Sequence, residues 1–555
     1  MKQLFRALIA SLVVFLAVPG GARAGQADPF HKEGRGKLSY ELDRIARESE
    51  RGGQVKSMSP AYNRAKGTVT VVIELNAGAS PDAIKSIVQA AGGRVDGVAG
   101  NLVKATMAPG VLRDVAAQPD VRFVRAPYRP TVKKAGRVGA ARIGAARRDN
   151  VVSQGVGVMN ADAYIARTGA DGSGITVAIL DSAFEGLAGL LGTEIPIDTA
   201  GTDFVLSHLD SPGIHGTACA EIVHDVAPGA HLLLGASEDD EVAWANQIDE
   251  LIADGARIIS HSQGWDNLAA PDGNDFWSQK VDAAAGRGVL FVTAAGNEGE
   301  KYFQTRWTDL NHNGRLDFAP DVEALPFVAT PPSTRVQLRW DDTFTRSNHD
   351  YDLAVVTPDF LANPDLSESN PAVVVVSGDV QNGAGDPLEG VTIQVSEPTL
   401  LYVVIVHDAA TPENANQRFF LWVSSGLDPA IANPASSLTM PGDARGAVTV
   451  GAVAWDSRGL EGYSSRGPTA DNRVKPDVVG PDAVDTASYG AGAFTGTSAA
   501  TPHVAGAAAL ILSKNPSLSV ASLRQALERA TTSGGSTSAK NNDVGFGLID
   551  LSRAP

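Results

Sequence analysis

The chain has 555 residues, which at roughly 150 residues per domain predicts three or four structural units. Its hydrophobic fraction of 43% and charged fraction of 20% match ordinary globular proteins, so disorder is excluded as the dominant state. The net charge of -17 argues against nucleic-acid binding, which draws most of its affinity from basic side chains.

Residues 1–24 have the pattern of a secretory signal peptide. Lys2 and Arg6 give a positive start, an apolar run follows, and Ala22 and Ala24 form the small-x-small pattern that precedes cleavage. The apolar run is about 12 residues long, whereas a membrane-spanning helix needs about 20. We therefore expect a secreted protein, periplasmic or extracellular, with no membrane span in its mature form.

After a predicted N-terminal linker (25–65), residues 66–128 have the pattern of a small α+β unit. The β-branched run TVTVVIEL predicts a strand, and Ser80 and Pro81 then provide the N-cap and first position of a helix. NLVKATM and VRFVRA predict further strands around a short second helix, which gives a split βαβ arrangement. The next segment (129–150) is a predicted linker, because its residues 129–148 include seven basic side chains, no acidic one, and many Gly and Ala.

Residues 151–305 and 429–555 share a pattern of apolar strands alternating with helices. The runs GITVAILD, AHLLLGAS, RIISHS and VLFVTAAGN show no polar–apolar alternation, and helical stretches lie between them. This pattern is typical of a parallel sheet covered on both faces. In such a sheet the site lies at the carboxyl ends of the strands, where Asp181 and Asn297 stand.

Between these segments, residues 306–428 contain many short strand patterns and no convincing helix. Runs such as VQLRW, YDLAVV and LLYVVIV are separated by turn residues, which predicts an all-β sandwich inserted into the α/β domain. The insert begins with DLNHNGRLD, whose oxygen-bearing side chains and central Gly follow the spacing of a calcium loop. Pro320 stands where such loops carry a bidentate Glu, so an ordinary polar turn is the alternative. The expected ligands of a structural Ca²⁺ are Asp309, Asn311, Asn313 and Asp317.

Three short segments carry the residue types of nucleophilic catalysis. VAILDSAF ends a predicted strand at Asp181, HGTACAEIV opens a helix at His215, and GTSAATPHVAG opens another at Ser498. A serine hydroxyl becomes a good nucleophile when a histidine takes its proton, and a carboxylate can orient that histidine. No cofactor is needed for this chemistry.

In this order, the three segments resemble the active-site motifs of the subtilisin-like serine peptidases. The resemblance implies a three-layer α/β fold with a parallel sheet, preceded by a small α+β propeptide and interrupted by the all-β insert. It also implies a serine endopeptidase that hydrolyses peptide bonds through an acyl-enzyme, with Asp181, His215 and Ser498 as its triad.

The resemblance assigns further residues around this triad. Asn297 matches the asparagine whose amide donates to the oxyanion. Ser262-Gln263-Gly264 and Ala294-Ala295-Gly296 match two backbone walls that bind substrate as an added strand. Gln263 departs from the family pattern, which usually has an apolar residue at this position. The expected substrate-binding residues are Ser262, Gly264, Ala294 and Gly296.

Residues 66–128 resemble the family's inhibitory propeptide, which implies a zymogen whose maturation cuts the basic linker. The expected partners are polypeptide substrates and this intramolecular inhibitor, with no nucleic acid, and we expect a monomer. The main alternative is a catalytically inactive binding protein that uses the peptidase fold as a scaffold and the insert to grip its ligand. An esterase ranks last, because Ser498 lacks the GxSxG elbow.

The single cysteine, Cys219, excludes an intramolecular disulfide. It stands one helical turn after His215, so a Cys–His catalytic pair is conceivable. Its flanking residues, Ala218 and Ala220, favour a small buried residue instead.

Overall fold

The structure is a computed structural model. It describes residues 36–51, 55, 59, 61–132, 151–201, 213–236, 240–367, 369–383 and 385–555. The predicted signal peptide and most of the basic linker therefore lie outside the described residues. The described residues divide into two compact units, one within 34–304, 335–339 and 420–555, and the other within 305–334 and 340–419.

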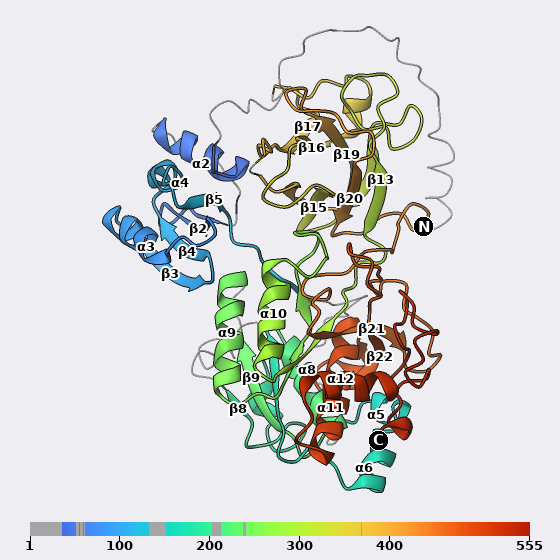
Figure 1. The fold of residues 1–555 in the computed structure, drawn as a ribbon. Coiled ribbons are helices and arrows are strands. Elements are labelled where there is room, and N and C mark those ends of the chain that lie inside the picture. Colours follow the sequence, from blue (N-terminus) through green and yellow to red (C-terminus); the bar gives the residue numbers. More distant parts are fainter. Residues whose placement is uncertain are drawn as a thin grey trace. The chain divides into compact units, whose positions relative to one another are not determined.

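A seven-stranded sheet forms the centre of the first unit, with strand order β22-β21-β12-β10-β7-β9-β8 (Figure 1). All of its pairings are parallel, as the sequence predicts. The last strand, β22, lies in a Gly-rich stretch and has no counterpart among the predicted strands. The strands are β7 (Thr176–Asp181), β8 (Ala200–Gly201), β9 (His231–Ala236), β10 (Ile258–His261), β12 (Leu290–Ala294), β21 (Ala447–Ala454) and β22 (Val478–Asp482).

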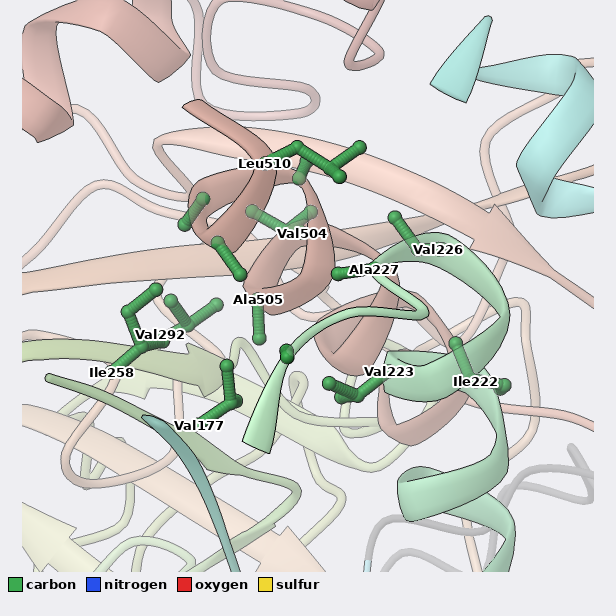
Figure 2. Close-up of a cluster of buried hydrophobic side chains, with 14 of the residues drawn as sticks. Val177, Ile222, Val223, Val226, Ala227, Ile258, Val292, Val504, Ala505 and Leu510 are labelled. Atoms are coloured by element: carbon green, nitrogen blue, oxygen red, sulfur yellow. The ribbon is translucent and has the colours of Figure 1, made fainter. Parts of the chain in front are cut away.

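The helices α8 (His215–Val226) and α11 (Thr497–Lys514) pack against each other and against this sheet. Figure 2 shows Val223 of α8, Val504 of α11 and Val292 of β12 as members of one buried cluster. A Cβ at Gly506 would lie only 2.7 Å from the Cβ of Val226, so glycine lets the two helices approach closely.

The helices α9 (Glu241–Ala253) and α10 (Phe276–Gly286) lie between strands, as the sequence predicts, and each begins after an acidic N-cap. The Asp240 side chain accepts from the backbone N–H groups of Val242 and Ala243, and Asp275 accepts from that of Ser278. The helix α12 (Val520–Arg529) follows α11. In the described part of the chain, every helix is too short or too polar to cross a membrane.

The N-terminal α+β elements of this unit form a five-stranded sheet, in which β5 pairs with β2 beside the path β1-β2-β4-β3. The predicted strands and helices are present, including a helix that begins at Pro81 with Ser80 as its N-cap. These elements are β1 (Tyr62–Asn63), β2 (Thr68–Leu75), α3 (Pro81–Ala90), β3 (Arg94–Ala99), β4 (Leu102–Met107), α4 (Leu112–Ala116) and β5 (Val121–Arg125).

One prediction for this region is wrong in part, because residues 25–65 are not simply a linker. They contain the helix α2 (Tyr40–Glu50), whose Leu42, Ile45 and Ala46 are fully buried in the core of the five-stranded sheet. The three residues follow helical spacing, and their burial against the sheet holds the helix in place.

The second unit is all-β, with one short 3₁₀ turn (Pro358–Leu361) among its described residues. Its strands belong to two four-stranded sheets, β13-β20-β15-β18 and β14-β19-β16-β17, and the strands β13, β15 and β20 also include residues of the first unit. The Tyr351 ring lies 5.5 Å from the Trp340 ring and 4.8 Å from the Phe419 ring, so aromatic side chains of both sheets are in contact. The strands are β13 (Tyr302–Arg306), β14 (Leu325–Ala329), β15 (Ser333–Trp340), β16 (Tyr351–Val356), β17 (Val373–Ser377), β18 (Leu388–Gln394), β19 (Thr399–His407) and β20 (Arg418–Val423).

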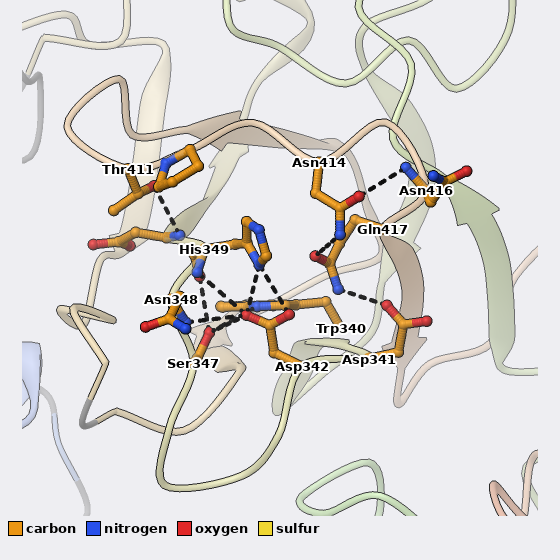
Figure 3. A network of polar contacts seen from close by, with 12 residues as sticks. Trp340, Asp341, Asp342, Ser347, Asn348, His349, Thr411, Asn414, Asn416 and Gln417 are labelled. Carbon is orange, nitrogen blue, oxygen red and sulfur yellow. Dashed lines mark hydrogen bonds and ion pairs between the residues drawn. The ribbon is translucent and has the colours of Figure 1, made fainter.

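A polar network fixes the loop between β15 and β16 (Figure 3). The Asp342 carboxylate accepts from the Ser347 hydroxyl at 2.8 Å and from the backbone N–H groups of Asn348 and His349 at 3.2 Å. It also lies 2.9 Å from His349 Nδ1. All of these bonds join residues of one loop, so their role is to hold the conformation of that loop.

Candidate active site

Asp181 and His215 form a buried pair at the carboxyl edge of the sheet. Asp181 is the last residue of β7, and His215 is the first residue of α8. His215 Nδ1 lies 2.7 Å from Asp181 Oδ2, and Asp181 Oδ1 accepts from the backbone N–H of Ser182 at 2.8 Å. His215 Nε2 is buried and has no hydrogen-bond partner among the described residues. The carboxylate therefore orients the ring so that Nε2 is the nitrogen open to proton exchange.

Ser498 lies at the start of α11, where the sequence predicts it. Gly496 is the N-cap and has φ 110°, in the left-handed region that favours glycine. The Ser498 Oγ donates to the backbone carbonyl of Ser262 at 3.1 Å. The hydrogen bond expected between Ser498 and His215 is thus not formed in this structure.

The Ser498 carbonyl connects the serine to the Asp–His pair. Pro502, four residues later in α11, lacks the N–H that would bond to this carbonyl. The carbonyl instead accepts from the Ser262 hydroxyl at 3.1 Å and lies 3.8 Å from Cys219 Sγ. Because Cys219 Sγ also lies 4.0 Å from Asp181 Oδ2, one side chain separates the serine backbone from the buried pair.

The surroundings of Cys219 do not favour a Cys–His catalytic pair. Burial raises the pKa of its thiol well above the ordinary value, and the Asp181 carboxylate adds to the shift. A thiol nucleophile needs the opposite shift, because the thiolate is the reactive form. Among the described residues, Asp181, His215 and Cys219 are the only three of the His, Cys, Asp and Glu side chains whose donor atoms lie within 4.8 Å of one another.

Asn297 lies directly beside the residue that precedes the serine. Its side-chain oxygen accepts from the backbone N–H and from the hydroxyl of Thr497, both at 2.9 Å. This orientation commits the amide oxygen and leaves the NH₂ group as the donor end of the side chain. A Cβ at the preceding Gly296 would lie 2.4 Å from Thr439 Cγ2, so a larger residue would displace this segment.

The two predicted substrate walls follow neighbouring parallel strands, since His261 of β10 is in register with Thr293 of β12. In the first wall, β11 (Gln263–Gly264) pairs antiparallel with β6 (Thr131–Val132). The second wall is paired differently, because the backbone N–H and carbonyl of Ala295 bond to Val450 and Thr439. Among the described residues, an added strand therefore pairs with the wall of Ser262 and Gly264, and none pairs with the wall of Ala294 and Gly296.

Comparison with known proteins identifies the family. The model of the subtilase family of S8 peptidases matches residues 172–316 and 404–547. The chain belongs to the subtilase family. The match omits residues 317–403, which lie within the predicted insert.

Several relatives resemble parts of this subtilase. A subtilisin of Bacillus pumilus is 31% identical over 199 residues, which are 29% of this chain and 69% of that protein. Subtilisin-like protease SBT1.9 of Arabidopsis thaliana is 25% identical over 350 residues, or 54% of this chain, so the chain spans only 44% of that relative's length. The structure of the Clostridium perfringens CspB protease has a TM-score of 0.49 at 15% identity, covering 72% of this chain and 98% of that one.

In this subtilase, the N-terminal α+β elements contact α9 through buried ion pairs. Arg125 lies between two carboxylates, with Nε 2.5 Å from Glu74 and Nη1 2.7 Å from Glu241. Lys104 Nζ lies 2.5 Å from Asp240, and the backbone N–H of Tyr128 donates to Glu241 at 2.9 Å. Burial raises the pKa of Glu241, while the Arg125 guanidinium counteracts that shift. The sequence predicts a helix here but no role in these ion pairs for Asp240 and Glu241, although adjacent acids at a helix start were a visible signal.

Asp482 is a third residue for which the sequence pattern predicts no role. It ends β22 and is fully buried, and its carboxylate accepts from the backbone N–H of Gly496 and from the Tyr463 hydroxyl. Burial raises the pKa of Asp482 to about 7. Its place at the carboxyl end of a parallel strand was the signal that could have identified it.

The predicted calcium loop in the second unit folds around its own carboxylates. The Asp309 oxygens accept from the backbone N–H groups of Asn313 and Gly314, and Asp317 accepts from that of Leu310. Glu323 accepts from the side-chain amides of Asn311 and Asn313 at 2.7 and 2.8 Å. Pro320 occupies position 12, where calcium loops carry a bidentate Glu, but the Glu323 carboxylate contacts this loop from position 15, counted from Asp309.

Several carboxylates lie close together on this loop, so it carries excess negative charge. Burial raises the pKa of Asp317, and the carboxylates of Glu323 and Asp309 add to the shift. Arg315 compensates in part, with Nη1 3.4 Å from Glu323. Among the described residues, no three carboxylates of the loop bring their oxygens within 4.8 Å of one another.

Proposed function

We propose that this subtilase is a secreted serine endopeptidase, periplasmic or extracellular, that is made as a zymogen. The observation that carries the proposal is the buried pair of Asp181 and His215, whose Nε2 has no partner among the described residues. The Ser498 backbone lies one side chain away, at the start of α11.

The reaction begins when Ser498 Oγ turns about χ1, away from the Ser262 carbonyl and toward His215 Nε2. His215 takes the proton as Oγ attacks the substrate carbonyl, and the Asp181 carboxylate stabilises the imidazolium that forms. His215 then gives the proton to the leaving amine, which leaves an acyl-enzyme on Ser498. Water, activated by the same nitrogen, hydrolyses the ester and restores the serine.

In this proposal, two donors stabilise the oxyanion of the tetrahedral intermediate. The Asn297 NH₂ group is one donor, since Thr497 holds the amide oxygen. The backbone N–H of Ser498 is a second, and the positive end of the α11 dipole adds to both. These groups need little reorganisation during the reaction.

The N-terminal α+β elements act as an intramolecular inhibitor in this proposal. The antiparallel pairing of Thr131–Val132 with Gln263–Gly264 supports it, because an added strand on this wall would exclude a substrate strand. The ion pairs of Arg125 and Lys104 with α9 would hold the inhibitor in place. Cleavage in the basic linker would then release the cleft.

The loop of Asp309, Asn311, Asn313 and Asp317 is proposed to hold a structural Ca²⁺, with Glu323 as a further ligand. The donor set supports this assignment, because Ca²⁺ prefers carboxylate and amide oxygens. The ion would neutralise the like charges that raise the pKa of Asp317. The proposed chemistry needs no cofactor.

The test compares Ser498→Ala with Ser513→Ala, which makes the same change near the other end of α11. Ser498→Ala is expected to abolish self-processing, casein hydrolysis and labelling by a fluorophosphonate, because all three need the hydroxyl. Ser513→Ala should retain all three. Normal processing by purified Ser498→Ala protein would overturn the proposal, and so would a wild-type protein that neither processes nor reacts with the label.

A further inference from the structure

Gln263 has an unsatisfied amide beside the proposed cleft. The side chain is only 1% exposed, and both Oε1 and Nε2 are buried without a hydrogen-bond partner among the described residues. Leaving a buried donor or acceptor unsatisfied lowers the stability of the folded state, and folded proteins contain few such groups. An amide with two unsatisfied atoms on a cleft wall therefore calls for a functional explanation.

The direction of the side chain follows from its neighbour. Ser262 directs its hydroxyl to the Ser498 carbonyl, and successive side chains of an extended segment point to opposite faces. The Gln263 amide therefore lies on the face of the wall away from Ser498. It cannot take part in proton transfer there, but it can contact a side chain of a bound strand.

The register between β11 and β6 shows which residue of a bound strand would contact the Gln263 amide. Gln263 lies directly opposite Val132 in the antiparallel pair. Residues in this relation share a face of the sheet, with their Cβ atoms about 4.5–5.5 Å apart. A substrate strand that replaces β6 in this register would place one of its side chains next to the Gln263 amide.

We propose that Gln263 is a specificity-determining residue that selects a neutral hydrogen-bonding side chain, an amide or a hydroxyl, at this substrate position. Asn, Gln, Ser or Thr would satisfy the amide, whereas an apolar side chain would leave both of its atoms unsatisfied. A charged side chain would be buried against a group that cannot neutralise it. The inference rests on the proposed endopeptidase function and adds a preference to it.

The test measures kcat/KM of the mature enzyme on a peptide library that is randomised at each position in turn. The wild type is expected to favour amide and hydroxyl residues over Leu and Val by at least about 10-fold at one position. Gln263→Leu should lose or reverse that preference at the same position and leave the other positions unchanged. Gln247→Leu, the same change at a buried glutamine of α9, should keep the wild-type profile.

The outcomes separate this inference from the proposed function. Unchanged preferences in an active Gln263→Leu enzyme, or a wild type without any polar preference, would overturn the inference alone. A wild type that cleaves no peptide and takes no fluorophosphonate label would overturn both. Folding is a small concern, because replacing an unsatisfied buried amide with an apolar group of similar size is nearly neutral or stabilising. The melting temperature of Gln263→Leu should therefore equal or exceed that of the wild type.

Discussion

Asp482 Oδ1 accepts a hydrogen bond from the backbone N–H of Gly496 at 2.7 Å. Gly496 lies two residues before Ser498, at the N-cap of α11, and its φ of 110° defines the turn from which the serine projects. The Tyr463 hydroxyl bonds to the other carboxylate oxygen and fixes the direction of the carboxylate. Asp482 is therefore a positioning residue, because it acts on the serine through the backbone of the turn.

Asp482→Ala is expected to lower kcat by about 10–100-fold with little change in KM, because a small displacement of the reacting group is costly. Asp482→Asn should recover most of the activity, since its amide oxygen can still accept from Gly496. Steady-state kinetics on a chromogenic peptide would measure both. If Asp482→Ala lowered the melting temperature but left kcat unchanged, the residue would have only a structural role.

The sequence predicts the residues that end or begin regular elements more successfully than those that act through distant partners. Asp181, His215 and Ser498 occupy the strand end and helix starts that the apolar patterns indicate. Asp482 was missed because β22 is short and lies in a Gly-rich stretch, and because its partner Gly496 belongs to another element. A local sequence pattern does not predict a hydrogen bond between residues of two different elements.

The same limit applies to the other elements that the sequence did not predict. The helix α2 is mostly polar and depends on tertiary contacts of three residues, so its pattern is weak. Glu241 pairs with Arg125, which is 116 residues away. Glu323 bonds to Asn311 of the predicted calcium loop because the chain turns at residues 319–322. The orientation of Ser498 Oγ toward Ser262 is likewise a tertiary detail.

Stability should decrease as the pH rises from about 4.5 to about 7, because two carboxyl groups of the first unit, those of Glu221 and Asp225, resist ionisation in the folded state. Burial raises the pKa of Glu221 from 4.5 to about 7, even though backbone N–H groups of Ala487 and Ser488 bond to it. Asp225 is raised to about 7 in the same way. A raised pKa in the folded state gives a contribution that is complete below the unfolded value and is lost as the pH passes about 7.

The variant Glu221→Gln should therefore melt a few degrees higher than its parent at pH 8.5, with the difference vanishing near pH 5. Its amide oxygen can keep a bond to the Ala487–Ser488 backbone, while the ionisation is removed. Calorimetry across pH 5–9 in a Ser498→Ala background would avoid self-digestion. An equal shift at both pH values would show that burial of charge is not the cause.

Removing the proposed oxyanion donor should affect the rate more than binding. Asn297→Ala is expected to lower kcat by about 10²–10³, the range known for loss of one such donor in subtilisin, with KM nearly unchanged. Thr497→Val removes only one of the two groups that hold the Asn297 oxygen, so its effect should be smaller, about 10-fold or less. Equal losses in both variants would indicate general disruption of the turn.

The contact between Lys104 and Asp240 should delay activation of the precursor. Lys104→Met removes an ion pair in which both side chains are largely buried, so the purified precursor should become active several-fold sooner. Lys85→Met removes an exposed ion pair with Asp82 in the same α+β unit and should leave the time course unchanged. Activity against casein after transfer to pH 8 would follow the process. Identical time courses for the wild type and both variants would contradict an inhibitory role for this contact.

Calcium should stabilise the loop that begins at Asp309. At a concentration 100 times the Kd, a ligand specific for the folded state adds about 2.7 kcal/mol, so Ca²⁺ should raise the melting temperature of the insert by several degrees and chelation should reverse the shift. Asp309→Ala should abolish the response and Glu323→Gln should weaken it, because each removes a carboxylate. Asp365→Asn, at an exposed acid of the same unit, should respond like the wild type. Calorimetry of Ser498→Ala protein with Ca²⁺, Mg²⁺ or chelator would measure this, and a wild type that melts at one temperature in all three would show that the loop is an ordinary polar turn.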